Sequence, residues 1–93
     1  MDPAFSWDPV KARANLAKHS VEFAEAAGVF RDTLSITLLD AAHSDREERF
    51  ITIGMSPKNR LLVVVHTDIG DVIRIISARQ ATPREIRAYE ESK

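Results

Sequence analysis

The stretch VIRIISARQATPREIRAYEE, residues 72–91, decides the fold class because a strand pattern is followed at once by a helix pattern. Its first part is rich in β-branched residues, which predicts a strand over 72–78. The letters TPRE that follow form a capping box with proline at the first helical position, so a C-terminal helix is predicted. Arg74 interrupts the strand pattern and Arg79 follows it. Because burying an arginine without a partner is costly, each needs a carboxylate or a bound anion.

Two helices are predicted before the first strand. In FSWDPVKARANLAKHS, Asp8 can cap a helix and Pro9 suits its first position, and VEFAEAAGVF predicts a second helix. Three more β-prone segments follow, at residues 34–39, 49–54 and 60–67. The connections MSPKN and DIGD are short enough for antiparallel hairpins. Two helices, four strands and one helix therefore predict an α+β domain with a four-stranded, mainly antiparallel sheet.

Length and composition are those of one folded domain, taken over residues 1–93. There are no cysteines, which excludes disulfides and thiolate metal sites. The longest aliphatic run, Leu61 to Val65, is too short to span a bilayer, and the N-terminus lacks a signal-peptide pattern. We therefore expect a cytoplasmic protein that does not associate with membranes. Thirteen Lys and Arg against 14 Asp and Glu give a net charge of -1, so nucleic-acid binding would require clustered cations.

The hairpins predict a register for the arginines. Tight turns at DIGD and MSPKN would place Arg49, Val65 and Arg74 in one row across three strands, with Arg60 opposite Arg79 on the other face. The two arginines of the row would then lie about 9–10 Å apart and repel each other. A phosphodiester would offset this repulsion, because guanidinium groups bind phosphate oxygens in a bidentate fork. A slip of one residue in either hairpin would move the set to the opposite face.

Structural ion pairs explain the same arginines equally well. Arg49, Arg74 and Arg79 can pair with acids near them in the sequence, which are Glu47, Glu48, Glu85 and Glu90. On these residues alone, ion pairs and an anion site have even odds, because both arrangements place charges in strands. A histidine at a helix end, such as His19, is more often a dipole partner than a catalyst, and Tyr89 is more often a core residue.

Metal and nucleotide chemistry are poorly supported. An oxygen-rich loop with Asp40, His43, Asp45 and Glu47 could be read as a metal site, but it has no recognised ligand spacing. The chain has no P-loop, no G-x-G-x-x-G, no H-E-x-x-H and no G-x-S-x-G. We expect no metal and no cofactor.

Several motifs in order resemble the BrnT toxin family. They are F-x-W-D-P-x-K-x-x-x-N-x-x-K-H at Phe5 to His19, E-x-R at Glu47 to Arg49, Gly54, R-L-L-V-V at Arg60 to Val64, I-R-I-I-S-A-R at Ile73 to Arg79, and a later E-x-x-x-Y. The resemblance runs from Phe5 to about Tyr89. Ser20 departs from it, since a K-H-G is expected there, and this should alter only the turn between the helices. Residues 1–4 lie outside it and are expected to be disordered or to derive from cloning.

The resemblance implies a toxin of a type II toxin–antitoxin system. Such proteins are ribonucleases with a RelE-like fold that cut RNA and block translation. Their partner is a BrnA antitoxin with a ribbon-helix-helix DNA-binding part, with which they form a heterotetramer. Toxin and antitoxin together repress their own operon, so DNA would be contacted only through the antitoxin.

The implied chemistry is metal-independent cleavage of a phosphodiester by the neighbouring ribose 2′-OH. A base activates the hydroxyl, an acid protonates the leaving 5′-oxygen, and cations stabilise the extra charge on the phosphate. We assign the charge stabilisation to Arg49 and Arg74, a further phosphate contact to Arg79, and proton transfer to His19 and Glu47. RNA contacts are assigned to Lys11, Lys18 and Tyr89, the last by stacking on a base or orienting an arginine. The alternative function is a non-catalytic interaction domain with structural arginines, which the near-neutral charge favours slightly.

Overall fold

A mixed sheet of five strands organises the chain in the computed structural model, which describes residues 3–43 and 47–92. The strands lie in the order β1-β5-β4-β3-β2, and their bounds are β1 (Ala4–Ser6), β2 (Ile36–Leu39), β3 (Arg49–Met55), β4 (Leu61–Ile69) and β5 (Val72–Gln80). The β1 strand pairs in parallel with β5, and the other neighbours pair antiparallel.

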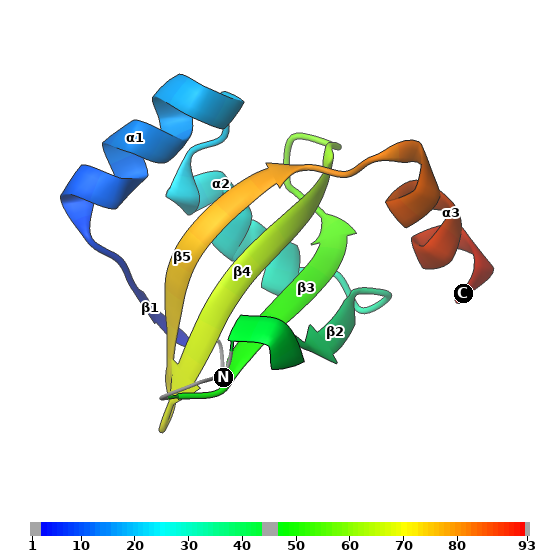
Figure 1. The fold of residues 1–93 in the computed structure, drawn as a ribbon. Coiled ribbons are helices and arrows are strands. Elements are labelled where there is room, and N and C mark those ends of the chain that lie inside the picture. The colour runs from blue at the N-terminus through cyan, green and yellow to red at the C-terminus, as the bar shows by residue number, and fades with distance from the viewer. Residues whose placement is uncertain (1–2, 44–46, 93) are drawn as a thin grey trace.

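Helices cover the two faces of the sheet unequally. The helical segments are α1 (Pro9–His19), α2 (Phe23–Gly28), the 3-10 turns η1 (Val29–Arg31) and η2 (Ala41–His43), and α3 (Pro83–Glu91). Figure 1 shows α2 behind the sheet and α3 beyond the end of β5. Core residues of α2 pack with Leu62 and Val64, whereas Tyr89 of α3 packs with Val63. Because side chains alternate along β4, α3 lies on the opposite face from α2. Within the described residues, no helix is long and apolar enough to cross a membrane.

The face that carries Leu62 and Val64 is called the helix face below, and the face that carries Val63 and Thr67 is called the arginine face. On the helix face, α1, α2 and η1 enclose the larger hydrophobic core. On the arginine face, α3 covers only the end near Val63 and Ile53.

The α+β class is confirmed, as are the four predicted strands, the two helices and the capping box at Thr82. The predicted four-stranded sheet was one strand short. The missed strand, β1, has three residues and precedes α1, and Ala4 begins it although we expected residues 1–4 to lie outside the ordered fold. Its parallel pairing with β5 depends on residues nearly 70 positions away, so it leaves no local sequence pattern.

The hairpin between β4 and β5 is tighter than predicted. Its turn consists of two residues led by Gly70, whose φ of 58° is the left-handed value that such turns require. Arg74 therefore pairs with Thr67, not with Val65, and Arg49 also pairs with Thr67. The predicted register was wrong by two residues in each hairpin. Because side chains alternate with a period of two, Arg49 and Arg74 still lie on the same face, as predicted.

The predicted position of Arg79 was wrong. An extra residue in β5 between Ile75 and Ser77 forms a bulge, so Val65 pairs with Ser77 while His66 pairs with Ile75. The bulge shifts the alternation by one, and Arg79 pairs with Val63 on the arginine face instead of lying opposite Arg60. Arg60 lies outside the strands and binds the buried Glu25 of α2.

Asn15 fastens α1 to the free edge of β5, beyond the point where β1 stops. Its amide nitrogen donates to the carbonyls of Val21 and Ala78, both at 2.9 Å, and its oxygen accepts from the Ala78 N–H at 3.0 Å. The Asn15 side chain thus makes the backbone hydrogen bonds that a neighbouring strand would otherwise make with Ala78.

Ser20, at the end of α1, has φ 57°, the left-handed conformation in which glycine is least strained. The left-handed φ explains why a glycine is expected at this position.

Replacing Asn15 with alanine should destabilise the domain by about 2–4 kcal/mol, because three buried backbone groups lose their partners. Urea unfolding followed by circular dichroism measures this. Asn15→Asp keeps the acceptor for Ala78 but turns a carboxylate oxygen toward two carbonyl oxygens at a buried site, so it should destabilise the domain at least as much as Asn15→Ala. Lys18→Ala, on the exposed side of the same helix, is the control and should change stability by less than about 0.5 kcal/mol. Equal stability of Asn15→Ala and the control would show that the edge of β5 is satisfied without this side chain.

Candidate functional site

A row of polar residues crosses the arginine face at the end of the sheet that α3 leaves uncovered. Arg49 on β3, Thr67 on β4 and Arg74 on β5 are direct cross-strand partners, and Ser6 on β1 is the next residue in line. Directly paired residues point to the same side of a sheet, so both guanidinium groups arise from one face. The predicted pair of Arg49 and Arg74 is therefore brought together, with Thr67 between them.

Arg74 is available for a ligand. Its side chain is exposed, and it makes no hydrogen bond or ion pair with any residue in the described part of the chain. Arg49 is half-buried at the first position of β3. Glu47 is exposed and precedes β3 by two residues, so the row has a carboxylate close to it in the chain.

Arg79 has the acidic partner that the ion-pair interpretation predicted. Its two terminal nitrogens donate to the two oxygens of Glu85, each at 2.8 Å. This fork from Arg79, helped by the Thr82 N–H, lowers the pKa of Glu85 to about 2. The pair links β5 to the first turn of α3, so Arg79 stabilises the fold, while its side chain remains 42% exposed on the arginine face.

Tyr89 is a core residue, and this corrects its assignment as an RNA-stacking group. The residue is 4% exposed, so the ring presents no face on which a base could stack. Its hydroxyl donates to Asp32 at 2.6 Å, and this bond, with burial, raises the pKa of Tyr89 to about 12. Asp32 also accepts from the Met55 N–H at 2.9 Å. Tyr89 thus helps to anchor α3 beside β3.

The predicted residues of α1 lie on a helix beside the free edge of β5. Lys11 and Lys18 are exposed, and His19 is the half-buried last residue of the helix. Because α1 lies beside the edge of β5, with Ala12 in the core of the helix face, these three side chains come from outside the strand row formed by Arg49 and Arg74.

The loop considered as a metal site shows an ion pair. The imidazole Nδ1 of His43 lies 3.2 and 3.1 Å from the two carboxylate oxygens of Asp40. Asp45 lies outside the described residues. Over residues 3–43 and 47–92, no three His, Cys, Asp or Glu side chains are grouped so that they could hold a metal ion.

A buried hydrogen-bonded chain on the helix face was missed by sequence reasoning. The His66 Nε2 lies 2.7 Å from the Thr52 hydroxyl, and its Nδ1 lies 2.8 Å from Asp68. A carboxylate, an imidazole and a hydroxyl in series form the constellation of a hydrolytic triad. The Thr52 hydroxyl is buried, however, and already bonded to both His66 and Thr37, so the chain joins strands β2, β3 and β4. The pairing of β3 with β4 brings Thr52 close to His66, and no motif in the sequence indicates this contact.

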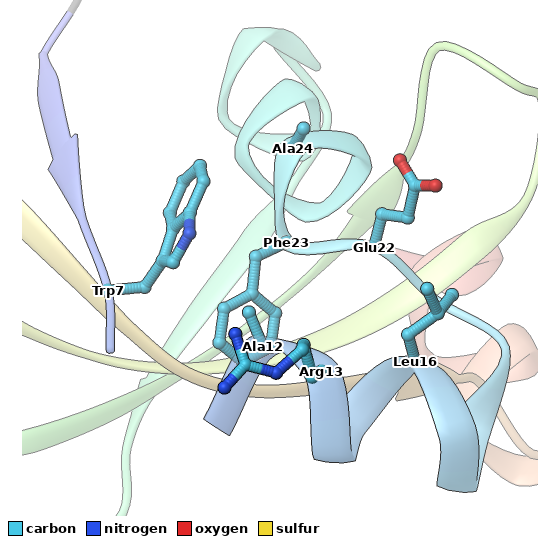
Figure 2. A pocket seen from close by; sticks show the side chains of 7 residues that line it. All are labelled: Trp7, Ala12, Arg13, Leu16, Glu22, Phe23 and Ala24. Carbon is cyan, nitrogen blue, oxygen red and sulfur yellow. The ribbon is translucent and has the colours of Figure 1, made fainter. Parts of the chain in front are cut away.

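A mostly apolar hollow with a volume of about 230 Å³ lies between α1 and α2. Figure 2 shows Trp7, Phe23 and Leu16 around it, with Arg13 and Glu22 at its border. None of the residues that line it is a predicted candidate for catalysis or RNA binding.

Comparison with known proteins identifies the fold and the family of this chain. The family described as "Ribonuclease toxin, BrnT, of type II toxin-antitoxin system" matches residues 7–85. The crystal structure of the Brucella abortus ribonuclease toxin, BrnT, superposes with a TM-score of 0.66 at 27% sequence identity, over 86% of this chain and 97% of that one. No curated protein sequence matches. The family match covers most of the chain, and the chain therefore belongs to the BrnT family of ribonuclease toxins of type II toxin–antitoxin systems.

Proposed function

We propose that this protein is a metal-independent endoribonuclease that cuts RNA at the arginine face and so inhibits translation in the cytoplasm. The observation that carries the proposal is Arg74, an exposed arginine in the middle of a strand with no protein partner among the described residues. Arg49 arises from the same row, so two cations can meet one phosphate. Family membership supplies the class of reaction.

The arginine row suits the transition state of 2′-OH attack. When the ribose hydroxyl attacks the adjacent phosphorus, the phosphate gains negative charge, and fixed cations stabilise that charge more than they stabilise the ground state. Arg74 and Arg49 can contact it from both sides. Arg79 can add a further contact only with the part of its guanidinium group that Glu85 does not occupy.

Glu47 is a better candidate than His19 for proton transfer. It is exposed and only two residues from Arg49, whereas His19 ends a helix that packs on the other face. Lys11 and Lys18 on that helix can bind only RNA that continues around the edge of the sheet. We therefore assign the first proton transfer to Glu47 as general base and give α1 an accessory role in binding.

Arg74→Ala should lower RNA cleavage by about 100–1,000-fold, because one group that stabilises the transition state is lost. The melting temperature should stay within about 2 °C, since Arg74 is exposed and holds no described residue in place. Cleavage of a labelled RNA and circular dichroism measure the two quantities. Arg13→Ala, an exposed arginine on α1, is the matched control for loss of one positive charge and should retain activity. An unfolded Arg74→Ala would assign the residue to structure, and full cleavage activity in a folded variant would overturn the catalytic role of Arg74.

Cleavage should continue in excess EDTA and should leave 2′,3′-cyclic phosphate or 3′-phosphate ends, because the attacking oxygen belongs to the RNA. Mass spectrometry of the product ends measures this directly. Products with 5′-phosphate ends and a strict need for added Mg²⁺ or Mn²⁺ would contradict the proposed chemistry.

We further propose that a BrnA-type antitoxin with a ribbon-helix-helix part covers the arginine face, in a heterotetramer that contacts DNA only through the antitoxin. Next to the arginine row lies an apolar row made by Leu38, Ile51 and Val65, which are direct partners on β2, β3 and β4. Leu38 is 54% exposed. An apolar strip beside cations suits a partner segment that combines leucine-like residues with acids.

If antitoxin covers this face, a non-cleavable RNA analogue should compete with it. Titration of antitoxin against the toxin, with and without the analogue, should show weaker binding in its presence, and the interface should bury about 800 Å² per partner. Leu38→Asp should weaken antitoxin binding and leave cleavage intact. A ternary complex in which both affinities are unchanged would place the antitoxin elsewhere.

A further inference from the structure

The hydroxyl of Thr67 has no hydrogen-bond partner, although it is fully buried. Among the buried side-chain nitrogen and oxygen atoms of the described residues, it is the one atom without a hydrogen-bond partner. Thr67 is 1% exposed. The buried hydroxyl of Thr52 on the neighbouring strand is satisfied, since it lies 2.7 Å from His66 and 2.8 Å from the Thr37 hydroxyl. Because unsatisfied buried hydroxyls destabilise a fold, the one at Thr67 calls for a functional reason.

The position of Thr67 supplies that reason. It is the direct cross-strand partner of both Arg49 and Arg74, so it occupies the centre of the arginine row. Paired Cβ atoms on neighbouring strands lie about 4.5–5.5 Å apart, so the threonine hydroxyl lies at the base of the sheet between the two arginine side chains. A tetrahedral phosphate has enough oxygens to accept from a cation on each side and from a donor on the sheet between them.

We propose that the Thr67 hydroxyl donates a hydrogen bond to a non-bridging oxygen of the phosphate held between Arg49 and Arg74. This inference rests on the proposed ribonuclease function and adds a third, uncharged contact to its site. The hydroxyl is covered in this structure, so the phosphate must displace a side chain to reach it. Arg74 is the neighbour most free to move, because it is exposed and forms no hydrogen bond with the described residues.

The test is a crossed pair of threonine-to-valine variants. Thr67→Val removes only an unsatisfied hydroxyl, so the melting temperature should stay equal or rise, while kcat/KM for RNA should fall by about 10–100-fold, the usual effect of one hydrogen bond to a charged group. Thr52→Val is the matched control. It removes a buried hydroxyl that has partners, so it should lower the melting temperature and leave the activity of the folded protein unchanged. Thr67→Ser should keep the activity.

Binding of inorganic phosphate separates this inference from the proposed function. Phosphate should raise the melting temperature of the unmodified protein, and the rise should be smaller for Thr67→Val. If RNA is not cut but phosphate binding still depends on Thr67, the subsite stands and the ribonuclease proposal fails. If RNA is cut and Thr67→Val is as active as the unmodified protein, the ribonuclease stands and the role of Thr67 is overturned. A Thr67→Val variant that loses stability while Thr67→Ser does not would also overturn it, by showing that the hydroxyl serves the fold.

Discussion

The extra residue in β5 sets the geometry of both faces of the sheet. Before the bulge, Arg74 lies on the arginine face and Ile75 on the helix face. After the bulge, Ala78 lies on the helix face and Arg79 on the arginine face. With an unbroken alternation, Arg79 would point toward α1 and Ala78 toward α3. The bulge therefore lets Ala78 close the core under α1, next to Asn15 on the edge of β5, and lets Arg79 reach Glu85. The attachment of two helices, on opposite faces, depends on this one insertion.

Electrostatic pairing explains how a domain of net charge -1 can present a cationic surface. Several acids serve the fold. Glu25 is buried and binds Arg60 and Ser56, Glu85 binds Arg79, and Asp32 accepts from Tyr89. The hydrogen bonds from Arg60 lower the pKa of Glu25, so this carboxylate stays ionised where it is buried. The net charge therefore does not predict where an anion could bind. That depends on which arginine or lysine side chain has no acidic partner in the folded protein.

Two buried threonines on neighbouring strands, Thr52 and Thr67, differ in whether their hydroxyl groups have hydrogen-bond partners. Thr52 belongs to a satisfied chain with His66 on the helix face, and Thr67 faces the other way with nothing to bind among the described residues. Two residues of identical chemistry thus differ in that the hydroxyl on one face has its hydrogen-bond partners and the hydroxyl on the other face lacks one. The same division holds for the arginines, since Arg60 and Arg79 bind acids and Arg74 does not.

The sequence by itself determined the α+β class, the positions of four strands, the capping box of α3 and the family, because each leaves a local pattern of propensity or spacing. It also placed Arg49 and Arg74 on one face, since a register error of two residues preserves the side on which a residue lies. Only the tertiary structure decided the fifth strand, the face of Arg79, the burial of Tyr89 and the position of Thr67 between two arginines. These features depend on a parallel pairing, a bulge and a turn conformation, which are fixed by contacts between residues far apart in the chain and have no local signal.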